Sequence, residues 1–229
     1  MSEKKVVKEG EGGEILVARA KDFWERNNKL LVIVAAVVIL GIAGYYGYKK
    51  YVIKPKEDKA VDAMFKAEEY FRMDSANLAL NGDGQNLGFI KLADRYGSTK
   101  AGKLANFYAG VCYMKLGDNE KAVKFLKDFS TSSKPLQARA YKLLGDAYAD
   151  LGKNSDALEN YKKAAHHFES DKASSSEVLF LAAYFADRVM KNQKEAIELF
   201  KELKKKYPRE RGQDADNYLA QMGVYNVEE

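Results

Sequence analysis

The chain has 229 residues, of which 46% are hydrophobic and 31% are charged, and its net charge is +5 at pH 7. Residues 57–229 carry 27 basic and 27 acidic side chains, and the four lysines Lys49, Lys50, Lys54 and Lys56 supply most of the excess. A confined excess of this kind argues against nucleic acid as a partner, which needs a basic face on the folded domain, and favours anionic lipid headgroups.

The first 29 residues form the segment that precedes the most apolar part of the chain. Residues 1–13 are polar and contain three glycines, so we expect them to be disordered. In residues 14–28 apolar side chains alternate with charges. This pattern fits a short helix at a membrane interface, and it fits equally well a helical lead-in without a role of its own.

Residues 30–48, LLVIVAAVVILGIAGYYGY, contain no charged side chain. A helix of these 19 residues is about 29 Å long, which matches the hydrocarbon core of a bilayer. Tyrosines crowd its downstream end, where aromatic rings favour the headgroup level. The stretch therefore predicts a single transmembrane helix; the alternatives are a buried core helix and a cleaved signal peptide.

Small residues lie close to one face of the predicted span, at Ala36, Ala43 and Gly47. Small side chains let a second helix approach closely in lipid, where packing drives association. The three positions are candidates for docking on a membrane partner, although glycine and alanine are also common in such helices without any partner.

Residues 49–56 read as a basic juxtamembrane linker in which Pro55 ends the helix. From Glu57 onward apolar residues recur every three or four positions, which predicts helix throughout and no strands. The sequence NGDG at residues 81–84 predicts the end of the first helix of this region. Its glycines follow a helix and not a strand, so an interhelical turn is favoured over a phosphate-binding loop.

An internal repeat of 35 residues is the main signal in the C-terminal region. Gly110, Tyr113, Gly117 and Ala122 are matched by Gly145, Tyr148, Gly152 and Ala157. This is the tetratricopeptide-repeat pattern, in which each repeat is a helical hairpin and small residues allow the two helices to touch.

Two further copies are degraded. Phe89, Ala93 and Tyr96 fit the second helix of an earlier copy, and Ala196, Phe200, Leu203 and Pro208 fit the second helix of a later one whose first helix, residues 180–189, needs a one-residue shift. Residues 212–222 predict a capping helix. The fold class is therefore all-α: one transmembrane helix, then about four hairpins and a cap over residues 57–229.

Side chains for catalysis are not gathered in any recognisable motif. The sequence has no serine elbow, HExxH motif or Walker loop, and its only cysteine, Cys112, lies in a helical pattern that predicts a buried apolar role. His166 and His167 are adjacent and cannot point the same way on a helix, so we expect both at the surface. We expect no enzyme, no cofactor or metal, and no small-molecule substrate.

Hairpin repeats offer a concave surface lined by the first helix of each hairpin. In the family pattern the groove positions are Leu104, Phe107, Val111 and Met114 in one hairpin, and Arg139, Lys142, Asp146 and Ala149 in the next. An apolar patch beside a charged one suits an extended peptide or a partner's helix. The alternative is that the helix beginning at Glu57 folds over residues 104–114 and buries them.

The segments FWERNNKLL and GSTKAGKLANFYAG, together with one span and a neutral repeat domain, resemble the YfgM family over residues 23–229. The resemblance implies an inner-membrane protein with a cytoplasmic N-terminus and periplasmic repeats. It also implies an accessory subunit of the Sec translocon, paired with a PpiD-like chaperone that receives emerging secreted proteins. The longer N-terminus and the irregular last hairpin depart from that family.

Charge alone favours the opposite topology. Four basic residues precede the span and five follow it within about fifteen residues, so the positive-inside count places the repeats slightly on the cytoplasmic side. The resemblance favours the periplasm. An envelope assembly or structural protein, active in outer-membrane biogenesis or cell division, is the alternative function.

Overall fold

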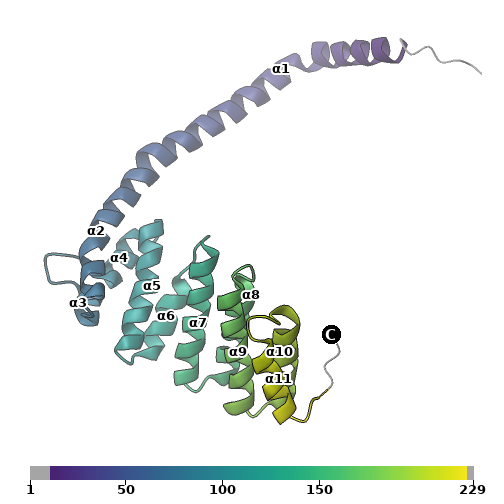
Figure 1. Cartoon of the computed structure of the whole chain (residues 1–229). Coiled ribbons are helices and arrows are strands. Elements are labelled where there is room, and N and C mark those ends of the chain that lie inside the picture. Colours follow the sequence, from purple (N-terminus) through teal and green to yellow (C-terminus); the bar gives the residue numbers. More distant parts are fainter. Residues whose placement is uncertain (1–10, 226–229) are drawn as a thin grey trace, which may run out of the picture. The chain divides into compact units, whose positions relative to one another are not determined.

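The computed structural model describes residues 11–225, and in this part of the chain every regular element is a helix. The all-α prediction is confirmed. Two compact units divide at Pro55 and Lys56, and each is described by itself (Figure 1). The first unit contains α1 (Glu11–Tyr48) and a π-helical segment (Lys49–Ile53). The following helices are α2 (Lys54–Arg72), α3 (Ala76–Asn81), α4 (Phe89–Tyr96), α5 (Lys100–Lys115), α6 (Asn119–Asp128), α7 (Lys134–Asp150), α8 (Asn154–His167), α9 (Lys172–Arg188), α10 (Gln193–Lys206) and α11 (Gly212–Gln221).

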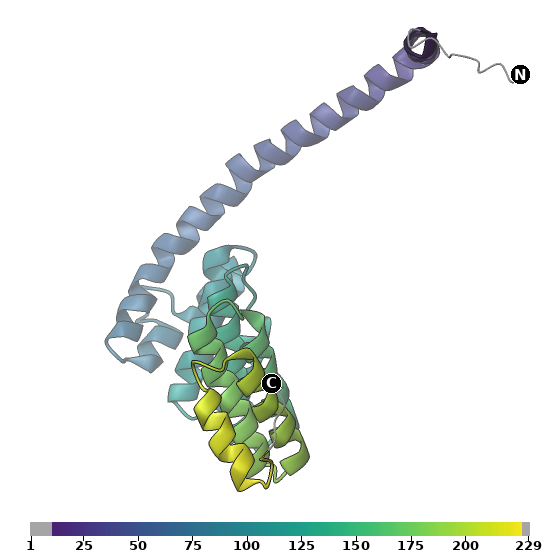
Figure 2. The ribbon, with the colours of Figure 1, turned by 45° about the vertical axis from the view of Figure 1, so that its right-hand side comes forward.

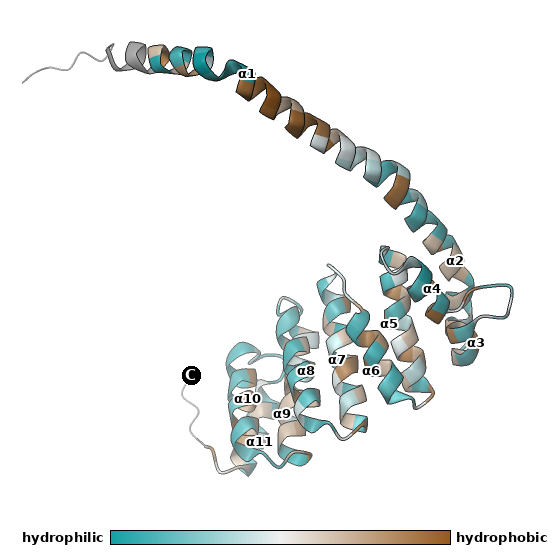
Figure 3. Cartoon of the chain, turned by 180° about the vertical axis from the view of Figure 1, so that it is seen from behind, coloured by the Kyte–Doolittle hydropathy of each residue, from teal (hydrophilic) through white to brown (hydrophobic). Residues whose placement is uncertain are grey.

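The apolar stretch of α1 makes no core. Its side chains are exposed, with Leu40 at 71% and Ile39 at 65%, and none of the most apolar window is buried. Figure 3 shows the first part of this stretch in brown, followed by paler turns. The alternative of a buried core helix is therefore wrong, and within the described residues this is the one helix long and apolar enough to cross a membrane.

Helix α1 begins earlier than the sequence suggested. Glu11–Gly13 are helical, so the predicted disorder does not extend to them, and residues 1–10 lie outside the described part. The helix runs without a break to Tyr48, so residues 14–28 belong to the same helix as the apolar stretch.

The prediction that Pro55 ends the helix is wrong. Lys49–Ile53 are π-helical, and the backbone N–H of Lys54 donates to the carbonyl of Lys49, five residues earlier. Proline interrupts an α-helix because its ring meets the carbonyl four residues back and because it lacks an N–H. A wider π turn just before Pro55 relieves that clash, so α2 includes the proline at its second position.

The second unit is a stack of helical hairpins (Figures 1 and 2). Helices α5 and α6, α7 and α8, and α9 and α10 pair in sequence order, and α11 packs on α10. Glycine sets the closest contacts within hairpins: a Cβ on Gly110 would lie 2.5 Å from Leu126, and one on Gly145 would lie 2.5 Å from the ring of Tyr161. The two glycines therefore fix how near the paired helices approach.

Each hairpin turns through a residue with a positive φ. Gly117 (φ 76°) and Gly152 (φ 69°) do so in the two regular repeats, and Asp74 (φ 59°) and Lys191 (φ 55°) do so in the degraded ones. The predicted first helix, expected to run to the loop at residues 81–84, is in fact broken at Asp74 into α2 and α3. Local helical periodicity continues on both sides of the break, which is why the sequence did not reveal it.

The first hairpin contains an inserted loop. Its second helix is split into α3 and α4, and Asp83 holds the loop between them by accepting hydrogen bonds from the backbone of Gln85 (2.9 Å) and Asn86 (2.6 Å) and from the Tyr70 hydroxyl (2.7 Å). The insertion lengthens the spacing to the next repeat to 43 residues. With that spacing, Ala67, Tyr70, Asp74 and Ala79 match Gly110, Tyr113, Gly117 and Ala122.

Two apolar clusters hold the stack together. One joins α2, α3, α4 and one face of α5, and includes Cys112, which is fully buried as expected. The other runs from the opposite face of α5 to α11. Glu57 ties the two ends of the first cluster, because its carboxylate accepts hydrogen bonds from the backbone N–H groups of Lys100 (2.7 Å) and Ala101 (2.8 Å) at the start of α5.

Candidate functional site

The four predicted groove residues of α5 are not equally available. Phe107 is only 4% exposed and its ring lies 5.3 Å from that of Phe129, so it is a core residue and not part of an open surface. Leu104, Val111 and Met114 are half-buried at the edge of the same cluster. Phe107 is buried because the turn after α6 places Phe129 against this face of α5.

The long helix α2 does not cover Val111 and Met114, although Leu104 packs against the cluster to which α2 belongs. Helix α2 packs in the first cluster with Ala105, Ala109 and Cys112, which lie on a different face of α5 from Val111 and Met114. The alternative in which α2 folds over residues 104–114 is therefore met only in part: Leu104 and Tyr108 pack against the cluster that contains α2, whereas Val111 and Met114 pack against the second cluster. The second cluster, to which α7 contributes, buries this face in part.

The predicted groove residues of α7 are polar and mutually paired, with one exception. Lys142 lies 2.8 Å from the Asp146 carboxylate, and the second oxygen of Asp146 accepts a hydrogen bond from the Tyr161 hydroxyl at 3.0 Å. Burial and the neighbouring Asp146 raise the pKa of Tyr161, which keeps this hydroxyl a donor. Arg139 is exposed and makes no ion pair with any residue in the described range.

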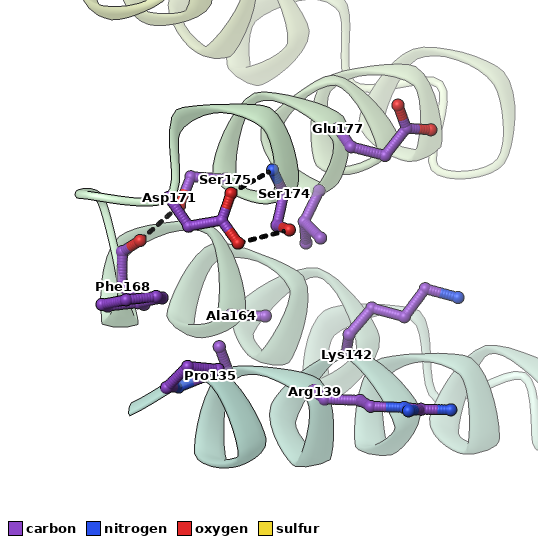
Figure 4. Close-up of a pocket in the computed structure, with 11 residues that line it drawn as sticks. Pro135, Arg139, Lys142, Ala164, Phe168, Asp171, Ser174, Ser175 and Glu177 are labelled. Carbon is purple, nitrogen blue, oxygen red and sulfur yellow. Dashed lines mark hydrogen bonds between the residues drawn. The ribbon is translucent and has the colours of Figure 1, made fainter. Parts of the chain in front are cut away.

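A pocket of about 350 Å³ lies between α7 and α9, above the end of α8 (Figure 4). Apolar side chains form its interior, and Arg139 and Lys142 of α7 face Glu177 of α9 across its outer part. The apolar lining consists of Pro135, Ala138, Ala164, Phe168 and Val178. Two predicted groove residues thus lie at a real depression in the surface.

The acidic groups of the pocket already have partners. Asp171 caps α9 by accepting from the backbone N–H (3.1 Å) and hydroxyl (2.8 Å) of Ser174, which lowers the pKa of the carboxyl. Glu177 forms an ion pair with Arg211, whose guanidinium lies 4.6 Å from the centre of the Phe180 ring. Because Lys142 is paired with Asp146, the charge left without a partner is that of Arg139.

Sequence reasoning missed the α9 wall of this pocket, and a usable signal was present. The 35-residue repeat that relates Gly110 to Gly145 also relates Arg139 to Ser174 and Lys142 to Glu177. The one-residue shift later in α9 hid this agreement.

The candidate membrane-docking residues are all accessible on α1: Ala36 and Ala43 are exposed, and a Cβ added to Gly47 would meet no atom within 4 Å.

The histidine and acidic side chains outside the pocket make contacts between and within helices. Among the described residues no three His, Cys, Asp or Glu side chains gather as metal ligands. His166 is not among the residues that line the pocket; its Nε2 lies 2.7 Å from Glu202, whose carboxylate also pairs with Lys206 at 2.9 Å. The His166–Glu202 contact joins α8 to α10, and the Glu202–Lys206 pair lies within α10.

Stacked helical hairpins with an open surface on their first helices define the class of helical-repeat proteins, which generally act as non-enzymatic scaffolds for protein–protein interaction. A family model described as a tetratricopeptide repeat-like domain matches residues 21–138, and one described as a tetratricopeptide repeat matches residues 113–176 and 142–211. The first match covers more than half of the chain, so the chain belongs to the tetratricopeptide repeat-like family. Comparison with curated proteins gave no match.

Proposed function

We propose that this protein is a non-enzymatic, single-pass membrane scaffold of the bacterial inner membrane and an accessory subunit of the Sec translocon. Its α1 span docks on the translocon, and its repeats, on the periplasmic side, bind a PpiD-like chaperone or emerging secreted proteins. The observation that carries the proposal is the exposed, uncharged stretch of α1 in a chain that otherwise forms a repeat stack with an open binding surface. The family match that begins at residue 21, and so includes this stretch, supports it.

The partners are tested by purifying the tagged full chain in mild detergent and identifying bound proteins by mass spectrometry. Translocon subunits or a PpiD-like chaperone are the expected result. Recovery of outer-membrane assembly or division proteins in their place would favour the envelope-assembly alternative and overturn this proposal.

The docking face is tested in the same preparation. Gly47→Leu and Ala43→Leu place bulk where the proposal needs close helix contact, so both should reduce recovery of membrane partners. Val38→Leu is the matched control, because it adds a larger side chain to the same exposed helix. Equal recovery with all three variants would remove the docking face from the proposal.

Topology is tested with alkaline phosphatase fused to the C-terminus, since this enzyme is active only after export. High activity is expected if the repeats are periplasmic. An inactive phosphatase fusion, together with a fluorescent cytoplasmic reporter at the same position, would establish the orientation that the charge count favours.

A further inference from the structure

The pocket between α7 and α9 combines an apolar interior with one arginine that has no partner. We propose that it binds a segment of a partner protein in which an apolar side chain lies beside a carboxylate: the apolar side chain enters between Ala138 and Val178, and the carboxylate pairs with Arg139. This inference rests on the proposed scaffold function and names the chemistry that the scaffold recognises.

Size and lining favour a single side chain over a whole helix. The volume of about 350 Å³ is near the lower end for ligand pockets, about 300–1,000 Å³. Its walls are small or flat: Pro135 and Ala138 on α7, Ala164 and Phe168 at the end of α8, and Val178 on α9. One inserted aromatic or aliphatic group would remove these surfaces from water.

Charge complementarity explains why the ligand carries a carboxylate beside the apolar side chain. Three of the four charged groups around the pocket are engaged: Asp171 with Ser174, Glu177 with Arg211, and Lys142 with Asp146. Arg139 projects along the outer part of the pocket in Figure 4 and is exposed. A guanidinium pairs with a carboxylate through two parallel hydrogen bonds, so an acidic group next to the inserted side chain is the natural complement.

Hydrogen bonds at the first turn of α9 hold one wall of the pocket in place before any ligand binds. Asp171 caps the helix, and the Ser175 hydroxyl donates to the Phe168 carbonyl at 3.1 Å, which ties the last turn of α8 to the first turn of α9. A preformed wall reduces the conformational entropy lost on binding, which matters for a short segment that makes few contacts.

The test measures fluorescence anisotropy of labelled peptides with the full chain in detergent micelles. Three amidated peptides share a glycine–serine background and carry Asp-Phe, Asp-Ser or Lys-Phe at the centre; a fourth has the Phe at a free C-terminus and no Asp. The Asp-Phe peptide should bind about tenfold more tightly than the Asp-Ser or Lys-Phe peptide. The fourth peptide tests the source of the carboxylate: the proposal places it on a side chain beside the inserted group, so this peptide should bind about tenfold more weakly than the Asp-Phe peptide.

Arg139→Glu should weaken Asp-Phe binding about tenfold and improve Lys-Phe binding. The matched control is Arg209→Glu, the same charge change at an exposed residue after α10, which should alter neither. With a photoreactive group in place of the Phe ring, cross-links should map to α7 and α9. Equal binding of the peptides, equal effects of the two variants, or cross-links elsewhere would overturn the proposal.

This outcome is separable from the proposed function. If the peptides fail to bind at the pocket while co-purification of membrane partners persists, the pocket assignment falls and the scaffold function stands. If no membrane partner is recovered while peptides bind as described, the pocket assignment stands and the translocon proposal falls.

Discussion

Gly145 illustrates how a single absent side chain determines a helix pair. A Cβ at this position would lie 2.5 Å from two atoms of the Tyr161 ring, closer than real Cβ contacts allow. Tyr161 is 3% exposed and its hydroxyl donates to Asp146, so the ring cannot move without losing both its packing and its hydrogen bond.

Gly145→Ala should therefore destabilise the protein by about 1–3 kcal/mol, the cost of overpacking a rigid contact. The measurement is urea unfolding of the full chain followed by far-UV circular dichroism. Gly41→Ala is the control, because no heavy atom lies within 4 Å of its added Cβ. An unchanged midpoint for Gly145→Ala would mean that α7 and α8 can separate freely.

Cys112 gives a second prediction at this scale. Its side chain is fully buried, and burial raises the pKa of the thiol to about 11. Because the thiolate is the reactive form, alkylation at pH 8 should be slow in the folded protein and fast in urea. The raised pKa also means that this thiol favours folding below its unfolded pKa and that the contribution is lost as pH rises toward 11. Rapid alkylation without denaturant would contradict the burial.

At the scale of elements, each hairpin turn contains one residue with a positive φ. Asp74, Gly117, Gly152 and Lys191 all adopt a left-handed conformation, which costs a side-chain-bearing residue about 1–2 kcal/mol. Asp74 is partly compensated by its ion pair with Lys115. Lys191 is exposed and makes no ion pair within the described residues.

Lys191→Gly should stabilise the protein by up to about 1 kcal/mol, since relief of the left-handed strain exceeds the added backbone entropy of glycine. Gly152→Ala at the matched turn should destabilise it by about 1–2 kcal/mol. Thermal unfolding of the two variants beside the unmodified chain measures both. Shifts of the same sign would show that turn conformation is not the cause.

At the scale of the whole molecule, the last helix of a hairpin stack must cover the apolar surface of the hairpin before it and present a polar face to water. Helix α11 does so: Leu219 is 1% exposed and the Tyr218 ring stacks on Phe200 at 4.9 Å, whereas Ala220 faces solvent. Terminal helices of repeat arrays must shield the last apolar surface, or the array associates through it.

Leu219→Glu should release α11, lower the unfolding temperature and cause aggregation, because it buries a charge without a partner. Ala220→Glu introduces the same carboxylate one residue later on the exposed side and should change neither. Scanning calorimetry and light scattering distinguish the two. If both variants behaved alike, α11 would not be acting as a cap.

The sequence by itself determined the helical class, the apolar stretch, the repeat period and the capping helix. The helical class and the apolar stretch follow from local composition and periodicity, and the repeat period follows from matching residues spaced 35 positions apart. The burial of Cys112 belongs with them, because its position within a repeat fixes the face on which it lies.

Only the tertiary structure decided the rest. Whether Pro55 ends a helix depends on the π turn before it. Whether the Phe107 side chain is exposed depends on Phe129, 22 residues later in the chain. The pocket requires α7, α8 and α9 together. Contacts between segments far apart in sequence set which face of a helix is covered, and no local pattern contains that information.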